Sequence, residues 1–188
     1  MIRTRITPVS GPVCKRVVAV LTAATAWDAS LCAALESAFG AIDYRGPFVP
    51  FTGDTYYRDE MGDGLHRGWV SFREVRDPSA LADWKHEARA VENRFRLPAA
   101  DGAAGPRACN LDVGYLDPDK LVLASFKPGP FKLYLGRDVW ADVILGYSRG
   151  VFTPTPWAFP DFRDGRYDKT LGVIREKLKA DMRARASG

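Results

Sequence analysis

Residues 17–23 form one short, continuous apolar run, VVAVLTA, that is rich in β-branched residues. A run of this length is typical of a strand that is buried on both faces of a sheet. It falls well short of the about 20 apolar residues that a membrane-spanning helix needs. A helical stretch follows, with Asp28 placed as its N-cap and Gly40 just past its end. The run therefore predicts a buried sheet with a helix packed against it.

The rest of the chain alternates between strand and helix patterns. Apolar or alternating runs predict strands at 69–75, 108–116, 120–126, 131–135 and 139–147, and apolar residues at helical spacing predict helices over 78–95 and 167–182. Segment 42–51 contains Pro47 and Pro50, so a strand there must be broken or lie at a sheet edge. The segment 98–107, rich in Pro, Gly and Ala, is expected to be an exposed loop.

This order of elements predicts an α+β fold. We expect a mixed, mainly antiparallel sheet with helices packed mainly on one face, in an arrangement similar to an elaborated ferredoxin-like core. In the last predicted strand, five residues are expected to share one core face: Val139, Ala141, Val143, Leu145 and Tyr147. The length suits a single domain, residues 1–188, with a flexible N-terminal arm at 1–14 and a C-terminal helix at 166–185.

The net charge of +4 is distributed unevenly along the chain. Residues 1–27 and 166–188 are basic, whereas the body between them has more acidic than basic side chains. Basic ends of this kind are more typical of solvated tails than of a DNA-binding surface, so nucleic acid is not the expected partner. The three cysteines have no C-x-x-C spacing, and we expect reduced thiols in a cytoplasmic protein that does not enter the membrane.

Several specific motifs are missing from the sequence. It contains no G-x-x-x-x-G-K-[ST], G-x-G-x-x-G, H-E-x-x-H or G-x-S-x-G. A P-loop nucleotide site is therefore excluded. With only His66 and His86, a multi-histidine metal centre is excluded as well. His66 lies in a glycine-flanked segment and is the better pocket candidate of the two histidines.

Three stretches carry more polar and aromatic side chains than a connecting loop needs: residues 54–62, residues 110–120 with Ser125 and Lys127 beyond them, and residues 155–164. Each also has a purely structural interpretation, respectively a helix cap with surface ion pairs, an Asx turn, and a loop held by buried aromatic rings. Enzymes commonly build pockets from such loops beside an apolar core. The three stretches therefore predict one site if they meet, and none if they lie on separate faces.

In such a site the acids would move protons and the cations would hold an anion. Glu60 and Asp112 are the candidate general bases, and Tyr57 and Tyr115 are the candidate proton donors. The candidate substrate-binding residues are Tyr56, Arg58, His66, Asn110, Lys120, Lys127, Trp157 and Arg163. The cations among them would clamp a carboxylate or phosphate, and Trp157 would cover a planar part of the ligand. No cofactor is expected, although Asp54, Asp59 and Glu60 offer oxygen ligands for Mg²⁺.

These residues predict a small-molecule enzyme or ligand-binding protein that performs acid–base chemistry on a small anionic substrate. Two alternatives stay open. One is a nucleic-acid-associated factor that uses the basic helix 166–185, and its affinity would fall steeply with salt. The other is an interaction subunit without chemistry, whose partner contacts Arg175, Lys179 and Arg183. The substrate, the reaction and the oligomeric state do not follow from these patterns.

Four segments in order, YYRDEMG, NLDVGYLDPDKLVLASFK, LYLGRDVWADVIL and PWAFPDFRD, resemble the bacterial family known as domain of unknown function 4416 over residues 15–180. The resemblance names no reaction. Two positions depart from the usual pattern of that family: Val113 stands where a proline is common, and Phe131 stands where members often have a histidine. The second departure removes a candidate acid–base group from the mechanism that other members would share.

Overall fold

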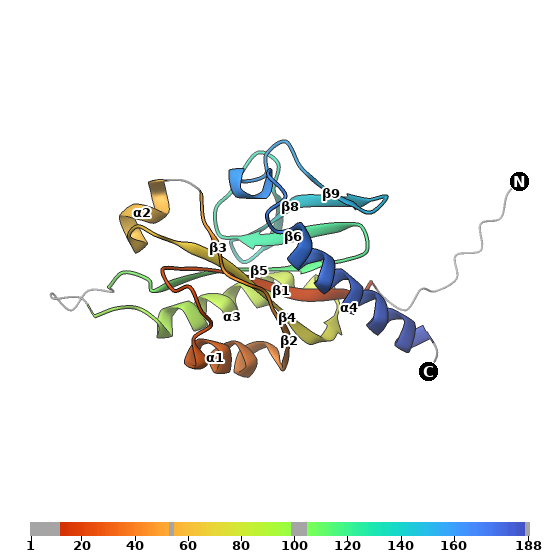
Figure 1. Ribbon diagram of the computed structural model, residues 1–188, viewed down its shortest axis with the longest axis horizontal. Coiled ribbons are helices and arrows are strands. Elements are labelled where there is room, and N and C mark those ends of the chain that lie inside the picture. The colour runs from red at the N-terminus through yellow and green to blue at the C-terminus, as the bar shows by residue number, and fades with distance from the viewer. Residues whose placement is uncertain (1–11, 53–54, 99–104, 187–188) are drawn as a thin grey trace, which may run out of the picture.

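The computed structural model describes residues 12–52, 55–98 and 105–186. One open sheet runs through this part of the chain, with its strands in the order β2-β4-β1-β5-β6-β8-β7, and with β3 also paired to β4 and β9 to β8 (Figure 1). The elements in chain order are β1 (Cys14–Thr22), α1 (Ala29–Phe39), β2 (Ile42–Arg45), β3 (Val49–Pro50), α2 (Thr55–Met61), β4 (His66–Arg76), η1 (Pro78–Ala80), α3 (Leu81–Arg94), β5 (Cys109–Leu116), β6 (Lys120–Ser125), β7 (Leu133–Gly136), β8 (Val139–Ser148), β9 (Val151–Pro154), η2 (Pro160–Phe162) and α4 (Asp168–Ala186).

The central strand β1 confirms the prediction made from the apolar run. All its residues are buried, and it pairs with β4 on one side and β5 on the other. The next helix, α1, also begins and ends where its capping residues predict. The side chain of Asp28 accepts a hydrogen bond from Leu31 N at 2.7 Å, and Gly40 follows the helix with φ +86°, a conformation that favours glycine. The predicted edge strand at 42–51 appears as β2 and β3, which both pair with β4.

Helices cover both faces of the sheet. α1 and α3 lie side by side on one face, over a core that includes Val18, Val20 and Phe72 (Figure 1). α4 packs on the other face, where Leu171 and Ile174 meet Val17 and Ala19 of β1. Because successive residues of a strand point to opposite faces, β1 contributes to both cores. None of the helices within the described ranges is long and apolar enough to cross a membrane.

The α+β class, the antiparallel sheet and the elaborated ferredoxin-like arrangement are confirmed. Helices α1 and α3 pack on one face, as expected, and α4 covers the opposite face. Every pairing between the described strands is antiparallel. Together with α1 and α3, strands β1, β2, β4 and β5 follow the chain order β-α-β-β-α-β and lie side by side as β2-β4-β1-β5, which is the arrangement of a ferredoxin-like core. Strands β6 to β9 and helix α4 elaborate this core.

The core face predicted for the last long strand is wrong beyond Val143. β8 pairs Val143 with Val122 but Leu145 with Leu121, so Ile144 is an extra residue in the ladder. A bulge of this kind reverses the alternation of the side chains that follow it. Val139 therefore packs in the core under α1 and α3, whereas Ile144 and Leu145 pack in the core under α4.

The loop predicted to be exposed at 98–107 is buried at its end. Residues 99–104 lie outside the described residues, as does most of the predicted arm 1–14. Gly105 and Arg107 are buried, and Arg107 forms an isolated bridge with Arg96. A Cβ atom on Gly105 would come within 1.8 Å of the carbonyl oxygen of Leu97, so only glycine allows the two backbones to approach this closely. The loop thereby brings the side chain of Arg107 beside the start of β5.

Candidate functional site

A pocket opens where β5 and β6 separate. The two strands pair only through Gly114, Tyr115 and Leu116, so no described strand pairs with Leu111 on that side. Helix α3 provides partners instead: Lys85 Nζ donates to Leu111 O at 3.0 Å, and Leu111 N donates to Glu92 Oε1 at 2.6 Å. Lys85 and Glu92 are two helical turns apart, which places them on the same face of α3. Two side chains of α3 therefore make the hydrogen bonds to Leu111 that a neighbouring strand would make. They also place charged groups at the edge of β5.

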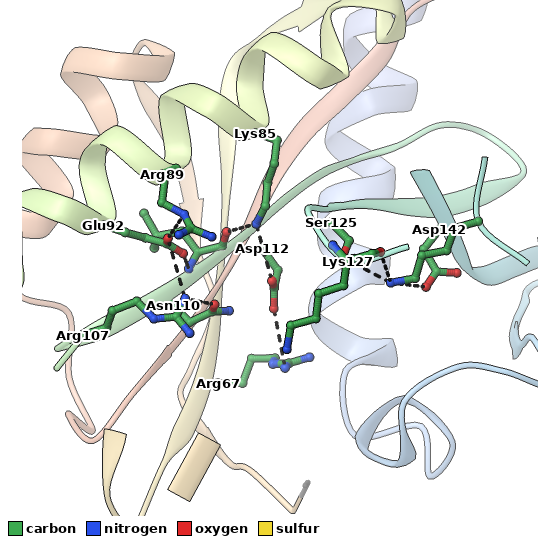
Figure 2. A network of polar contacts seen from close by, with 12 residues as sticks. Arg67, Lys85, Arg89, Glu92, Arg107, Asn110, Asp112, Ser125, Lys127 and Asp142 are labelled. Atoms are coloured by element: carbon green, nitrogen blue, oxygen red, sulfur yellow. Dashed lines mark hydrogen bonds and ion pairs between the residues drawn. The ribbon is translucent and has the colours of Figure 1, made fainter. Parts of the chain in front are cut away.

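The pocket has a volume of about 160 Å³ and is lined mainly by charged side chains. Its lining combines four cationic side chains, two carboxylates and three neutral residues from the described part of the chain: Lys85, Arg89, Arg107, Lys127, Glu60, Asp112, Tyr57, Asn110 and Phe126. Figure 2 shows Lys85, Arg89 and Glu92 reaching from α3 toward β5. The lining therefore carries an excess of positive charge.

Arg107 joins the helix α2 to the start of β5. Its Nε and Nη2 donate to the two carboxylate oxygens of Glu60 at 2.7 and 2.5 Å, and its Nη1 donates to Asn110 Oδ1 at 2.8 Å. These hydrogen bonds hold the pKa of Glu60 below its usual range, although partial burial opposes the shift. Glu60 is therefore an ionised partner of Arg107, which makes it a poor candidate for the general base.

Asp112 lies between two buried cations. Its Oδ1 is 3.9 Å from Lys85 Nζ and its Oδ2 is 3.8 Å from Arg67 Nη2, while its side chain stays 21% exposed (Figure 2). Burial lowers the pKa of Lys85, against the attraction of Asp112 and Glu92. Among the described residues of this pocket, Asp112 is thus the carboxylate that no cation holds by a close hydrogen bond.

The amide of Asn110 is only half satisfied. Asn110 is 5% exposed, and its Oδ1 accepts from Arg107, but its Nδ2 has no hydrogen-bond partner among the described residues. A buried amide donor without a partner costs about 1–3 kcal/mol. Since Asn110 lines the pocket, an acceptor that enters there could satisfy this donor.

Two further cations complete the lining. Arg89 Nε lies 3.2 Å from Glu92 Oε2, and its guanidinium packs over the ring of Phe126 at 4.9 Å. Lys127 follows the end of β6 and points toward the pocket from the side opposite α3 (Figure 2). Its charge also lowers the pKa of Glu60, after the larger effects of Arg107 and Arg96. Positive groups thus approach the pocket from α3, β6 and the loop before β5.

The structure brings together residues from two of the three predicted stretches. Tyr57 and Glu60 of the first and Asn110, Asp112 and Lys127 of the second line the same pocket. The side chain of Tyr56 lies outside the described residues, and so does Asp54. The first two stretches therefore meet at one pocket, whereas the hypothesis of a common site required all three.

Other predicted site residues lie elsewhere. Tyr115 packs against the core under α1 and α3, and Lys120 forms an ion pair with Asp117 in the turn before β6. Arg58 pairs with Asp63 at 2.7 Å on the exposed side of α2. These side chains stabilise their own turns and helices.

His66 begins β4, next to Thr22 and Pro50, and is outside the pocket lining. Its Nδ1 is buried and has no hydrogen-bond partner among the described residues. Arg163 donates to the carbonyl oxygens of Ala158 and Pro156 at 3.0 and 3.1 Å, which ties down its own loop. Neither residue reaches the pocket.

The third stretch supports the pocket from behind. Asp161 is fully buried, and its Oδ2 accepts from Tyr167 OH at 2.9 Å and lies 2.9 Å from Arg67 Nη1. Arg67 in turn lies beside Asp112. A chain of polar contacts therefore runs from the loop at 155–164 to the pocket, although Arg163 and Trp157 do not line it.

Trp157 belongs to a neighbouring network. Its Nε1 donates to Asp142 Oδ1 at 3.1 Å, and its ring stacks on Phe131 with centroids 4.5 Å apart. Lys132 Nζ lies 3.7 Å from Asp142 Oδ2 and donates to the carbonyl oxygen of Lys127 at 3.3 Å. Trp157 thus supports the segment that carries Lys127, and Phe131, one of the two departures from the family pattern, serves as its stacking partner.

The described residues contain no group of three His, Cys, Asp or Glu side chains placed to hold a metal ion. Of the proposed Mg²⁺ ligands, Glu60 is engaged by Arg107 and Asp59 is exposed on α2. Asp54 lies outside the described residues.

Sequence patterns missed the cations that dominate the pocket. Lys85, Arg89 and Glu92 recur at helical spacing beside the apolar stripe of α3, and this position at the border of a buried face was the available signal. Arg107 offered no signal, because it follows a segment that reads as an exposed loop. Arg67 was hidden in a strand whose neighbours are mostly apolar.

The cations of α4 proposed for a partner have contacts within their own chain. Arg175 Nη2 donates to Pro118 O at 3.1 Å, and its guanidinium lies 3.8 Å from the ring centroid of Tyr147. Lys179 Nζ donates to Glu176 Oε1 at 2.9 Å. Arg183 also has an interaction of its own.

Comparison with known proteins gives one match. The model of the family described as domain of unknown function (DUF4416) covers residues 12–178. No curated protein and no solved structure matches the chain. The matched range includes the whole of the pocket and the third stretch behind it.

Proposed function

The chain belongs to the DUF4416 family, and we propose that it is a small-molecule enzyme or ligand-binding protein whose ligand carries a phosphate or carboxylate group in the pocket between β5 and β6. One observation carries this proposal: four cations and an unsatisfied amide donor converge on a pocket that holds only two carboxylates among its described residues. An anion would balance the charge and accept the free hydrogen bond.

The size of the pocket restricts the ligand. Pockets for drug-sized molecules typically measure about 300–1,000 Å³. At about 160 Å³ this one suits a phosphate group or a short carboxylate, with the remainder of the ligand outside. Arginine and lysine both hold such groups, and a guanidinium can do so with two parallel hydrogen bonds.

Asp112 is the residue that we assign to acid–base chemistry. It is partly exposed in the pocket and lies 3.9 Å from Lys85 Nζ and 3.8 Å from Arg67 Nη2. Glu60 is less suitable, because both of its oxygens already accept hydrogen bonds from Arg107. Tyr57 lines the same pocket and is the proton donor that we retain from the sequence analysis.

Calorimetric titration with inorganic phosphate and with succinate at low salt tests the binding proposal. Lys127 is exposed at the pocket, so Lys127→Ala should leave the fold intact and weaken binding by about tenfold. Lys179→Ala removes one charge from the surface of α4 and should leave affinity unchanged. Absence of binding by both anions, or an equal loss in the two variants, would contradict the proposal.

Asp112→Asn separates binding from chemistry. The substitution removes a negative charge from a positive pocket, so we expect anion affinity to rise by about tenfold, or about 1.4 kcal/mol. For any bound molecule that the protein converts, the same variant should lose turnover. Unchanged affinity would place Asp112 outside the ligand's electrostatic environment, and full turnover would remove it as the base.

A further inference from the structure

Two adjacent cations of β1 are buried on opposite faces of the sheet and differ in their partners. Lys15 is fully buried, and its Nζ lies 2.6 Å from Asp43 and 2.5 Å from Asp181 and donates to Arg73 O at 3.1 Å. Arg16 is 4% exposed, yet it forms no ion pair among the described residues. The charge of Lys15 is compensated by two close ion pairs, whereas that of Arg16 is attracted only by more distant carboxylates.

Aromatic rings enclose the guanidinium of Arg16. Its Cζ atom lies 4.8 Å from the ring centroid of Phe39 and 5.2 Å from those of Phe72 and Trp84. Nη2 donates to Phe39 O, but Nε is buried without a partner among the described residues. Burial lowers the pKa of Arg16 to about 10, which reflects the cost of a desolvated charge. No carboxylate of the described residues lies within ion-pair distance of this guanidinium, so a carboxylate of a ligand would supply a close countercharge and an acceptor for Nε.

A second pocket gives access to Arg16. It has a volume of about 380 Å³ and lies between the C-terminal end of α1 and the start of α3, the two helices that share one face of the sheet (Figure 1). Arg16, Phe39 and Trp84 form its buried floor. This volume falls in the usual range for pockets that enclose a small molecule.

The rim of this pocket has the opposite character to its floor. Asp77, Glu87 and Arg76 line the rim and are exposed, and Arg76 is already paired with Glu74 at 2.6 Å. The C-terminal end of α1 adds a partial negative charge. Positive charge therefore lies at the bottom, beside the rings of Trp84 and Phe39, and negative charge lies at the opening.

We infer that this second pocket binds an amino carboxylate, a small molecule with a carboxylate at one end and an ammonium group at the other. The carboxylate accepts hydrogen bonds from the guanidinium of Arg16, and the ammonium group lies between Glu87 and the carbonyl end of α1. Trp84 and Phe39 contact the apolar part. This pocket lies on the other side of α3 from the pocket that contains Lys85 and Asp112, and the two share no lining residue in the described part of the chain. A test of one proposal therefore does not decide the other.

Thermal unfolding of the full chain with each of the twenty standard amino acids tests this inference. We expect at least one amino acid to raise the unfolding temperature in a concentration-dependent manner. For the best of them, the analogue without the amino group should bind about tenfold more weakly by calorimetry, because it loses the contact with Glu87. The analogue without the carboxylate should not bind. Inorganic phosphate is the control for an anion that has no amino group.

Two variants connect binding to the pocket. Arg16→Met should abolish the thermal shift, and Glu87→Gln, an exposed change on α3, should weaken binding by about tenfold. Glu176→Gln on α4 and Lys127→Ala at the other pocket are the controls and should bind as the wild type does. If Arg16→Met does not fold, Glu87→Gln still provides the test.

Three results would overturn the inference. One is the absence of a shift with every amino acid. Another is a shift with phosphate that persists in Lys127→Ala and is lost in Arg16→Met, since the second pocket would then bind any anion. The last is wild-type affinity in Glu87→Gln, or an unaltered shift in Arg16→Met where that variant folds. Each of these results leaves the titrations with phosphate and succinate at the first pocket unaffected.

Discussion

The two pockets on either side of α3 differ in how closely their buried cations are paired with carboxylates. At the split between β5 and β6, Arg107 is held by Glu60 and Arg67 by Asp161, so these cations are paired before any ligand arrives. At the junction of α1 and α3, Arg16 is buried among aromatic rings, and no carboxylate of the described residues lies within ion-pair distance of it. Removing the partner of a paired buried cation is costly, whereas an unpaired cation leaves its electrostatic attraction available to a ligand.

The largest expected effect tests the paired side of this comparison. Asp161→Asn removes the carboxylate next to Arg67 and should lower the free energy of unfolding by about 3–5 kcal/mol, because it leaves a buried cation uncompensated. Urea denaturation measures the change. Asp164→Asn, which breaks the exposed pair with Arg166, is the matched control and should cost less than about 1 kcal/mol. Equal small losses would mean that Arg67 does not depend on its partner.

An intermediate effect should depend on pH. Arg107 lowers the pKa of Glu60 in the folded protein below the usual value of 4.5, so the pair stabilises the fold fully above about pH 4.5 and loses this contribution as the pH falls through the lowered pKa. We expect Glu60→Gln to cost about 1–2 kcal/mol at neutral pH, because a hydrogen-bonded charge is lost.

The difference between wild type and Glu60→Gln should then shrink as unfolding is repeated at lower pH. Glu176→Gln is the control, because Glu176 is exposed and pairs with Lys179 at the surface. A difference that stays constant down to pH 3 would show that the carboxylate charge of Glu60 contributes no stability.

The smallest expected effect tests the unpaired side. Arg16→Met should change the free energy of unfolding by less than about 1 kcal/mol in the absence of ligand. The variant loses the contacts with three aromatic rings and the hydrogen bond to Phe39, but it no longer buries an unpaired charge, and these effects oppose each other. Arg107→Met should lower the free energy of unfolding several times more, because it leaves Glu60 and Asn110 without their hydrogen-bond donor. Similar losses in both variants would remove the distinction between the two pockets.

The amino-acid sequence by itself determined the elements that depend on local patterns. The buried strand β1 follows from its apolar run, and α1 follows from its caps, Asp28 and Gly40. Chain order and alternation were enough for the α+β class. Half of the candidate site could also be predicted, since Tyr57, Glu60, Asn110, Asp112 and Lys127 were selected as polar groups in loops and strand ends and line one pocket.

Only the tertiary structure decided which charged side chains of these pockets are paired with opposite charges. The bulge at Ile144 reverses a face that simple alternation predicts, because an extra residue has no signature in the strand pattern. Lys85, Arg89 and Arg107 enter the site because β5 and β6 separate and α3 fills the gap, an event that joins segments far apart in the chain. The same holds for Arg16, whose missing partner becomes visible only when every neighbour is in place. Charge compensation is a property of three-dimensional surroundings, so a pattern along one dimension does not contain it.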